Sequence, residues 1–295
     1  MFKNILVGSD GSCESLRATQ MAAAIAKPMN ATVVALNVFN LSAAAAYLAP
    51  EALSCAEEIV KCGEAAQKEA LEESGSILAK AGVAFRTRAE SGHPVETTIR
   101  VAADENADMV VVGTHGRNGL QRIFLDSVSD GVARHAPCPV LVVRGYMSTI
   151  DNILVASDGS EEAGQALRAA AEIARAVSAS ITVLNVVDFG DVSNEPDAEE
   201  TDEYAYGPRM LKLVKQRTDD VLKDSGIEYR VTQQHRNPAE AIMDYAVASG
   251  ADLIAIDSRG LGTFGRMLLG SVSNAILHHA PCPVLIVRDC RHELT

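Results

Sequence analysis

Two aspartates that directly follow an apolar run are the first candidate ligand contacts in this chain. Asp10 lies in SDGS at 9–12, and Asp158 lies in an identical SDGS at 157–160. An aspartate before glycine commonly forms a turn, and its carboxylate is equally suited to contact a bound molecule. The sequence leaves both roles open.

A second candidate feature joins glycines to serines. GTHG at 113–116 is followed by SVS at 127–129, and DSRG at 257–260 is followed by GSVS at 270–273. Glycine lets the backbone approach a ligand, and the first turn of a helix offers N–H groups that are free to bind an anion. We therefore expect phosphate chemistry here, although serine hydroxyls at a helix start also act as N-caps.

Each copy of this feature carries an aspartate where the other has a glycine. Asp126 stands where the second copy has Gly270, and Asp257 stands where the first copy has Gly113. The two copies therefore share a skeleton but differ in charge. Asp126 stands at the expected phosphate position, whereas Asp257 lies nearer the strand end, where its carboxylate is suited to a ribose hydroxyl or a metal ion.

The elements that must position these residues follow from a duplication. NILVGSDGS at 4–12 returns as NILVASDGS at 152–160, and HAPCPVLVVR at 135–144 returns as HAPCPVLIVR at 279–288. A chain of 295 residues is long enough for two cores. We predict two domains, at 1–146 and 150–295.

Each copy alternates short Val/Ile/Leu runs with longer amphipathic stretches, which is typical of βα units around a buried parallel sheet. In the first copy we predict strands near 3–9, 31–39, 83–89, 108–113 and 139–144, and helices near 13–27, 55–80, 94–106 and 127–135. Ser12 and Ser160 are predicted N-caps, and Pro94 and Pro238 suit a first helical position. The acidic segment 188–204 is predicted to be a loop.

In an open parallel sheet, ligands collect beyond the carboxyl ends of the strands, where the strand order reverses. Both SDGS turns and both glycine–serine features follow strands, so they should face one crevice in each domain. GLGTFG at 260–265 matches a dinucleotide fingerprint in letters only, because it follows the fourth strand and no acidic residue lies about twenty positions on. It also lacks the Lys and Ser/Thr of a phosphate-binding Walker loop.

Composition excludes several classes of partner. Acidic residues number 39 against 26 basic ones, and no basic block offers a surface for nucleic acid or an anionic membrane. No apolar run is long enough to span a bilayer, and the start of the chain does not resemble a signal peptide, so we expect a cytoplasmic protein. The six cysteines form no CxxC pair, and the His135–Cys138 spacing lacks a second pair of ligands, so we predict structural thiols and no metal site.

Taken together, NILVxSDGS, the glycine–serine feature and HAPCPVLVV resemble the universal stress protein family, and both copies match. The resemblance implies an α/β fold of two tandem doubly wound domains, each with a five-stranded parallel sheet in the order 3-2-1-4-5. It also implies that ATP-binding members hold adenine and ribose between the ends of the first, second and fourth strands.

Carried onto this sequence, the resemblance implies nucleotide-binding residues in both domains. In the second domain they are Asp158, Val186, Gly260, Gly270, Ser271, Val272 and Ser273. In the first domain they are Asp10, Val38, Gly113, Gly116, Ser127, Val128 and Ser129. The ligand would be ATP or another adenine nucleotide, with magnesium as its accompanying ion. Because a carboxylate at the position of Asp126 repels phosphate, we expect weaker binding in the first domain.

The leading hypothesis is a cytoplasmic, stress-related regulatory protein that binds an adenine nucleotide and forms a homodimer of tandem chains. No catalytic residue is predicted, because His115 has Arg259 as its counterpart and no acid–base pair recurs in both copies. The alternative is a nucleotide-independent interaction scaffold whose crevices have degenerated. Slow ATP hydrolysis ranks below both.

Overall fold

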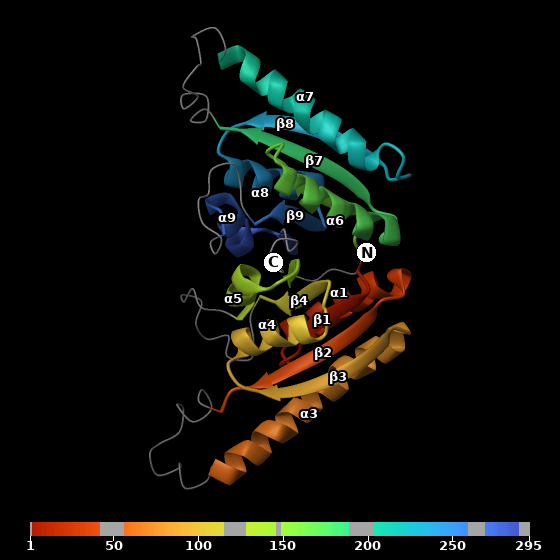
Figure 1. The fold of residues 1–295 in the computed structure, drawn as a ribbon, viewed down its shortest axis with the longest axis vertical. Coiled ribbons are helices and arrows are strands. Elements are labelled where there is room, and N and C mark those ends of the chain that lie inside the picture. The colour runs from red at the N-terminus through yellow and green to blue at the C-terminus, as the bar shows by residue number, and fades with distance from the viewer. Residues whose placement is uncertain are drawn as a thin grey trace. The chain divides into compact units, whose positions relative to one another are not determined.

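The computed structural model describes residues 2–41, 56–114, 128–145, 149–188, 203–258 and 269–288. The chain divides into two compact units, Met1–Arg144 and Gly145–Thr295, which we call the first and second domains. Each domain repeats the same succession of strands and helices (Figure 1).

The first domain contains β1 (Asn4–Gly8), α1 (Cys13–Met29), β2 (Thr32–Phe39), α3 (Ala56–Ala81), β3 (Ala84–Ser91), α4 (Pro94–Asp104), β4 (Met109–Gly113), α5 (Val128–His135) and β5 (Val140–Val143). Its strands pair in parallel in the order β3-β2-β1-β4-β5. The predicted boundaries of these elements lie within two residues of the observed ones.

The second domain contains β6 (Asn152–Ala156), α6 (Glu161–Val177), β7 (Ser180–Val187), α7 (Glu203–Leu222), β8 (Tyr229–His235), α8 (Pro238–Ser249), β9 (Leu253–Asp257), α9 (Ser271–His279) and β10 (Val284–Val287). Its strands pair in parallel in the order β8-β7-β6-β9-β10. Both domains therefore confirm the predicted doubly wound fold with strand order 3-2-1-4-5.

Helices cover both faces of each sheet. In the first domain α1 packs against α3 on one face, and α4 packs against α5 on the other. The second domain repeats this arrangement with α6 against α7 and α8 against α9. Between the layers, the central strands bury their side chains completely, as Ile5 and Leu6 of β1 and Ile153 and Leu154 of β6 illustrate. Strands buried on both faces explain the continuous apolar runs of the sequence.

An aspartate fixes the amino end of the central strand pair in each domain. The carboxylate of Asp108, just before β4, accepts hydrogen bonds from the backbone N–H groups of Lys3 and Asn4 at 2.7 and 2.9 Å. Asp252 before β9 does the same for Asp151 and Asn152, at 2.8 and 2.9 Å. Because these bonds pin the fourth strand to the first, the carboxyl ends of both strands finish side by side.

The predicted helix starts are confirmed where the structure describes them. The hydroxyls of Ser12 and Ser160 accept hydrogen bonds from the N–H groups of Ser15 and Ala163, at 3.2 and 3.0 Å. Helices α4 and α8 begin at Pro94 and Pro238, as expected.

The predicted loop at 188–204 needs one correction. Helix α7 begins at Glu203, so the last two residues of that segment are helical. Residues 189–202 lie outside the described part of the chain. Among the helices that are described, none is long and apolar enough to cross a membrane.

A network of ion pairs joins edge strand β3 to the end of α4 in the first domain. The Arg88 guanidinium contacts the carboxylates of Glu90, Asp104 and Glu105 at 2.7, 3.2 and 3.0 Å. Arg100 contacts Glu90 at 2.8 Å and Asp104 at 3.2 Å. The hydrogen bond from Arg88, and then that from Arg100, lowers the pKa of Glu90. Charged side chains on an edge strand also discourage unwanted pairing with other chains.

We expect Glu90→Gln to lower the stability of the first domain at neutral pH by at most about 1 kcal/mol, because the network is partly exposed. A carboxylate with a lowered folded pKa contributes stability above its unfolded pKa of about 4.3, and that contribution is lost as pH falls through the folded value. The variant should therefore lose less stability than the parent between about pH 5 and pH 3. Calorimetric unfolding at both pH values measures the difference.

The matched control for this substitution is Glu72→Gln. Glu72 pairs with Lys68 at 3.8 Å, and its side chain is 68% exposed. The control should keep the acid sensitivity of the parent. An equal effect of the two substitutions would contradict a specific role for the β3–α4 network.

Candidate functional site

The loops predicted to contact the ligand begin one residue beyond the ends of the first and fourth strands. Beyond β1, the N–H of Ser9 donates to the Leu36 carbonyl at 2.8 Å, and beyond β6 Ser157 donates to Leu184 at 3.0 Å. Beyond β9, Ser258 donates to Val287 at 2.8 Å. The backbone ladder thus continues one residue past the strands, so the turns after the first and fourth strands open at one edge of each sheet.

Asp10 and Asp158 form the turns that start α1 and α6. Asp10 Oδ1 accepts hydrogen bonds from the backbone N–H of Ser12 at 2.9 Å and from its hydroxyl at 2.5 Å. Asp158 Oδ1 accepts from the Ser160 N–H at 2.8 Å. The turn-forming role that the sequence left open is therefore present in both domains. Contact of either carboxylate with a ligand stays a prediction.

The backbone conformation of the SDGS turn explains why its third residue is glycine. Gly159 has φ +78, a left-handed conformation that other residues rarely adopt, and it is buried beneath α7. Gly11 adopts φ +74 in the first domain. The turn therefore keeps its shape only with glycine at this position.

Val38 and Val186 lie near the carboxyl ends of β2 and β7, level with Glu90 and Gln234 on the adjacent strands. The residue before each valine is a buried asparagine that the sequence analysis did not single out. Asn37 Nδ2 donates to the Ser9 carbonyl at 2.6 Å, and Asn185 Nδ2 donates to the Ser157 carbonyl at 2.9 Å.

These two asparagines tie the second strand to the start of the SDGS turn. The sequence repeat marks these residues, because Asn37 and Asn185 occupy equivalent places in ALNV and VLNV. A polar residue inside an otherwise apolar strand requires a hydrogen-bond partner when it is buried. The repeat therefore marks a shared structural need.

The fourth strands end differently in the two domains. A Cβ atom added at Gly113 would lie 2.8 Å from the backbone carbon and oxygen of Glu14, so α1 approaches this glycine closely. The equivalent residue at the end of β9 is Asp257, which is 6% exposed. The second domain therefore accommodates a buried carboxylate where the first has no room for any side chain.

The serines of the SVS stretches turn back toward the fourth strand. Ser273 Oγ donates to the Asp257 carbonyl at 2.7 Å, and Ser129 Oγ donates to the Thr114 carbonyl at 3.4 Å. Both side chains are almost fully buried. In α9 the predicted capping role is wrong, because the N-cap is Gly270 and no side chain caps the helix.

The start of α9 presents unused backbone donors. The Gly270 N–H donates to the Ser258 carbonyl at 2.9 Å, and the Gly270 carbonyl accepts from Asn274 at 2.8 Å. The N–H groups of Ser271, Val272 and Ser273 have no acceptor within the described part of the chain. Amides in the first turn of a helix are suited to bind an anion.

Three of the predicted site residues, Gly116, Ser127 and Gly260, lie outside the described residues. His115, Asp126 and Arg259 lie outside them as well. Val128 is described as the first residue of α5 and is 42% exposed. Within the described ranges, no group of three or more His, Cys, Asp or Glu residues is arranged to hold a metal ion.

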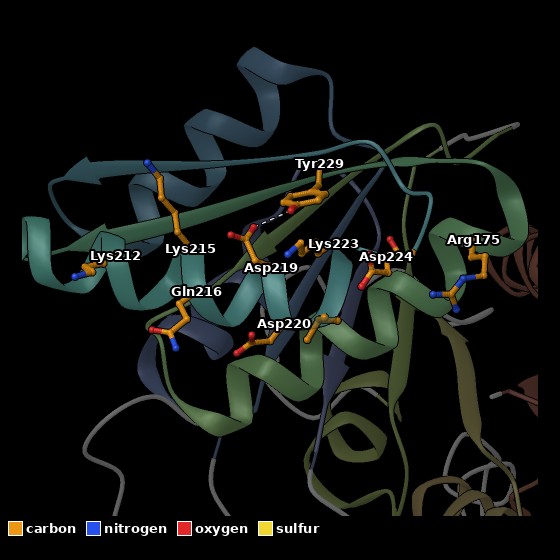
Figure 2. A pocket seen from close by; sticks show the side chains of 11 residues that line it. Arg175, Lys212, Lys215, Gln216, Asp219, Asp220, Lys223, Asp224 and Tyr229 are labelled. Atoms are coloured by element: carbon orange, nitrogen blue, oxygen red, sulfur yellow. Dashed lines mark hydrogen bonds between the residues drawn. The ribbon is translucent and has the colours of Figure 1, made fainter.

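A hollow of about 1000 Å³ lies elsewhere on the second domain, beside the last turns of α6 and α7 and the start of β8 (Figure 2). Its lining alternates cations such as Lys212 and Lys215 with carboxylates such as Asp219, which accepts a hydrogen bond from the Tyr229 hydroxyl at 2.7 Å. That hydrogen bond raises the pKa of Tyr229. Because the labelled side chains do not converge and the hollow lies at the amino end of β8, we do not assign it a ligand.

Comparison with known proteins finds two matches to the model of the Universal stress protein family, at residues 1–144 and 149–288. A universal stress protein of Mycobacterium tuberculosis is 30% identical over 308 residues, covering 97% of each chain. One from Mycolicibacterium smegmatis is 29% identical over 302 residues, covering 96% of each chain. The crystal structure of a universal stress protein from Archaeoglobus fulgidus has a TM-score of 0.70 at 24% identity, covering 97% of this chain and 98% of that one.

The close approach at Gly113 gives a direct test of the first domain. We expect Gly113→Ala to destabilise this domain by about 1–3 kcal/mol, because the new methyl group meets the backbone of α1, which cannot rotate away. Chemical denaturation of the full chain measures the change.

Gly8→Ala is the matched control, since its Cβ would meet Val112 Cγ1 at 3.5 Å and the Val111 carbonyl oxygen at 4.0 Å, which are ordinary van der Waals distances. That substitution should change stability by less than about 1 kcal/mol. Equal effects at Gly113 and Gly8 would show that the α1 contact does not constrain the end of β4.

Proposed function

We propose that this chain, which belongs to the universal stress protein family, binds ATP or another adenine nucleotide at the carboxyl ends of the strands of its second domain. Nucleotide occupancy would regulate a stress response, and the protein would act by binding rather than by catalysis. The setting we propose is the cytoplasm, with the tandem chain as a homodimer.

The observation that carries this proposal is the open start of α9. Three consecutive amides, those of Ser271, Val272 and Ser273, lack an acceptor among the described residues, and Gly270 has no side chain that could cap them. The partial positive charge of a helix N-terminus favours an anion at this place. The phosphates of a nucleotide supply such an anion.

The remaining contacts follow from the turn after β6. Asp158 starts α6 beside the end of β9, and Val186 lies one residue beyond Asn185, which holds the Ser157 carbonyl at 2.9 Å. We assign the adenosine part to Asp158 and to the backbone near Val186. This assignment agrees with what the family resemblance implies for these positions.

The first domain supports phosphate binding less well. At the position of Gly270 its sequence has Asp126. A carboxylate there would meet the phosphates with like charge, and in a poorly hydrated crevice this would oppose binding by about 2 kcal/mol. We therefore assign the stronger site to the second domain.

Magnesium would enter with the phosphates rather than through a site of the protein's own. In the described ranges the phosphate end offers one carboxylate, Asp257, and no cluster of three potential ligands. Magnesium is commonly held by one or two carboxylates together with substrate phosphates and water. The donor set therefore fits an ion carried by ATP.

One observation favours a second candidate function, an interaction scaffold that needs no nucleotide. Asp257 is 6% exposed at the end of β9 and adds a negative charge near the proposed phosphates. If this carboxylate closes the crevice, the paired domains would serve only to bind other proteins. Adding nucleotide to the purified chain separates the two functions.

The decisive substitution is Gly270→Asp, which transfers the charge of Asp126 to the second domain. Gly270 has φ −59, so its backbone conformation is compatible with aspartate, and aspartate is itself a favoured N-cap. We expect the variant to remain folded and to bind ATP at least roughly tenfold more weakly, with a smaller effect on adenosine. Calorimetric titration of the full chain with both ligands gives the two affinities.

The reciprocal variant, Asp126→Gly, is the matched control. It should leave the second site unchanged and strengthen ATP binding in the first domain, which a rise in stoichiometry would report. Unchanged ATP affinity in Gly270→Asp would contradict the proposed phosphate site. A parent chain that binds no adenine nucleotide, and that releases none on denaturation when analysed by mass spectrometry, would favour the scaffold.

A further inference from the structure

We propose that helix α7 positions the ligand turn of the second domain, through a tether from Arg217 and a hydrogen-bond relay through Gln233 and Asn185. This inference rests on the proposed nucleotide site and adds residues that lie behind it. The relay begins on β8, passes through β7 and ends at the turn that carries Asp158.

The relay is a continuous chain of short hydrogen bonds. Gln233 Nε2 on β8 donates to Asn185 Oδ1 at 2.6 Å and to the carbonyl of Gly207 on α7 at 2.8 Å. Asn185 Nδ2 then donates to the Ser157 carbonyl at 2.9 Å. Two amide side chains therefore connect the first turns of α7 to Ser157, the residue that precedes Asp158.

Arg217 makes a second connection from farther along the same helix. Its Nη1 donates to the carbonyl of Gly159, the residue between Asp158 and the N-cap Ser160. Gly159 is buried, with the α7 side chains Met210, Leu213 and Val214 closest to it. A charge-assisted hydrogen bond in a partly buried place holds its partner more firmly than one between neutral groups.

The first domain achieves the same connection with different residues. Ser9 Oγ, before Asp10, donates to the Ala70 carbonyl of α3 at 3.2 Å and lies 2.7 Å from Ser74 Oγ. The counterparts of Ser9 and Ser74, Ser157 and Thr218, bond instead within their own turn and helix. Counted from Gly82 and Gly226, the glycines with positive φ that precede β3 and β8, Glu73 stands where the second domain has Arg217.

Each domain also has a glutamine that links the helix to the strands, but it lies on a different element in each. In the first domain Gln67 lies on the helix, and its Nε2 donates to the strand carbonyls of Asn37 and Glu90 at 3.3 and 2.8 Å. In the second domain Gln233 lies on the strand and reaches the helix. The two domains connect the helix to the turn with different residues, which indicates that the position of the turn matters. A purely space-filling contact would not need polar partners on both sides.

A fixed turn favours binding because a ligand need not order it. Asp158 and the first amides of α6 would otherwise lose conformational freedom when nucleotide binds, at a cost to affinity. The same contacts couple occupancy to α7. Nucleotide binding would therefore change the contacts of α7. The acidic segment 189–202 immediately precedes this helix in the sequence.

The test compares Arg217→Met with two other variants of α7 in the full chain. Arg217→Lys keeps the charge and part of the reach, and Lys215→Met removes one positive charge from an exposed position on the same helix. We expect Arg217→Met to weaken ATP binding roughly tenfold, Arg217→Lys to recover part of that loss, and Lys215→Met to match the parent within about twofold. Calorimetric titration measures all four proteins.

If Arg217 only stabilised the fold in general, Arg217→Lys would not recover ATP affinity. Hydrogen exchange would then also change throughout the domain and not only at the turn. Hydrogen exchange of the Gly159 and Ser160 amides, measured without ligand, should be faster in Arg217→Met and unchanged in Lys215→Met. If Arg217→Met fails to fold, Gln233→Leu tests the relay, and it should show the same faster exchange and weaker binding.

The outcomes separate this inference from the proposed function. A parent chain that binds no nucleotide contradicts the proposed function, while faster exchange at Gly159 in Arg217→Met still supports the tether. Parent-like exchange and parent-like affinity in Arg217→Met would overturn the tether even if ATP binds. Equal losses of affinity in Arg217→Met and Lys215→Met would also overturn it, since the general charge of α7 would then explain both.

Discussion

The pairing of the first strand with the fourth is the constraint on which the site in each domain depends. Asp108 and Asp252 fix this pair at its amino end by binding two backbone N–H groups each. Because parallel strands advance together, the turns after β6 and β9 then open side by side. Under the proposed function, a ligand at this edge would meet the SDGS turn on one side and the start of α9 on the other.

Duplication within one chain provides an internal comparison of what the scaffold requires. The asparagine bond to the SDGS turn, the positive φ of its glycine and the serine bond to the end of the fourth strand occur in both domains. The charges near the phosphate end do not, as Asp126 against Gly270 and Gly113 against Asp257 illustrate. We infer that the shared features maintain the end of the sheet, and under the proposed function the differing ones would set what it can bind.

The fold could be predicted from sequence because its signals are local. Runs such as NILVG and MVVVG form strands buried on both faces, and Pro94, Pro238 and Ser12 mark helix starts by their own chemistry. The contacts behind the site could not be predicted in this way. Arg217 meets Gly159 across 58 positions and Gln233 meets Asn185 across 48, so their partners become visible only once the strands are paired. Ser273 was assigned to a cap or a phosphate, because sequence alone does not show that its hydroxyl reaches the Asp257 carbonyl.

The central claim is that the first amides of α9 receive the phosphates of an adenine nucleotide. The most direct measurement is the change in backbone amide NMR shifts when ATP, and separately adenosine, is added to the labelled full chain. We expect the amide signals of Ser271, Val272 and Ser273 to shift strongly with ATP and much less with adenosine, while the turn at Asp158 responds to both. Unperturbed amides at 271–273 in the presence of bound ATP would contradict it.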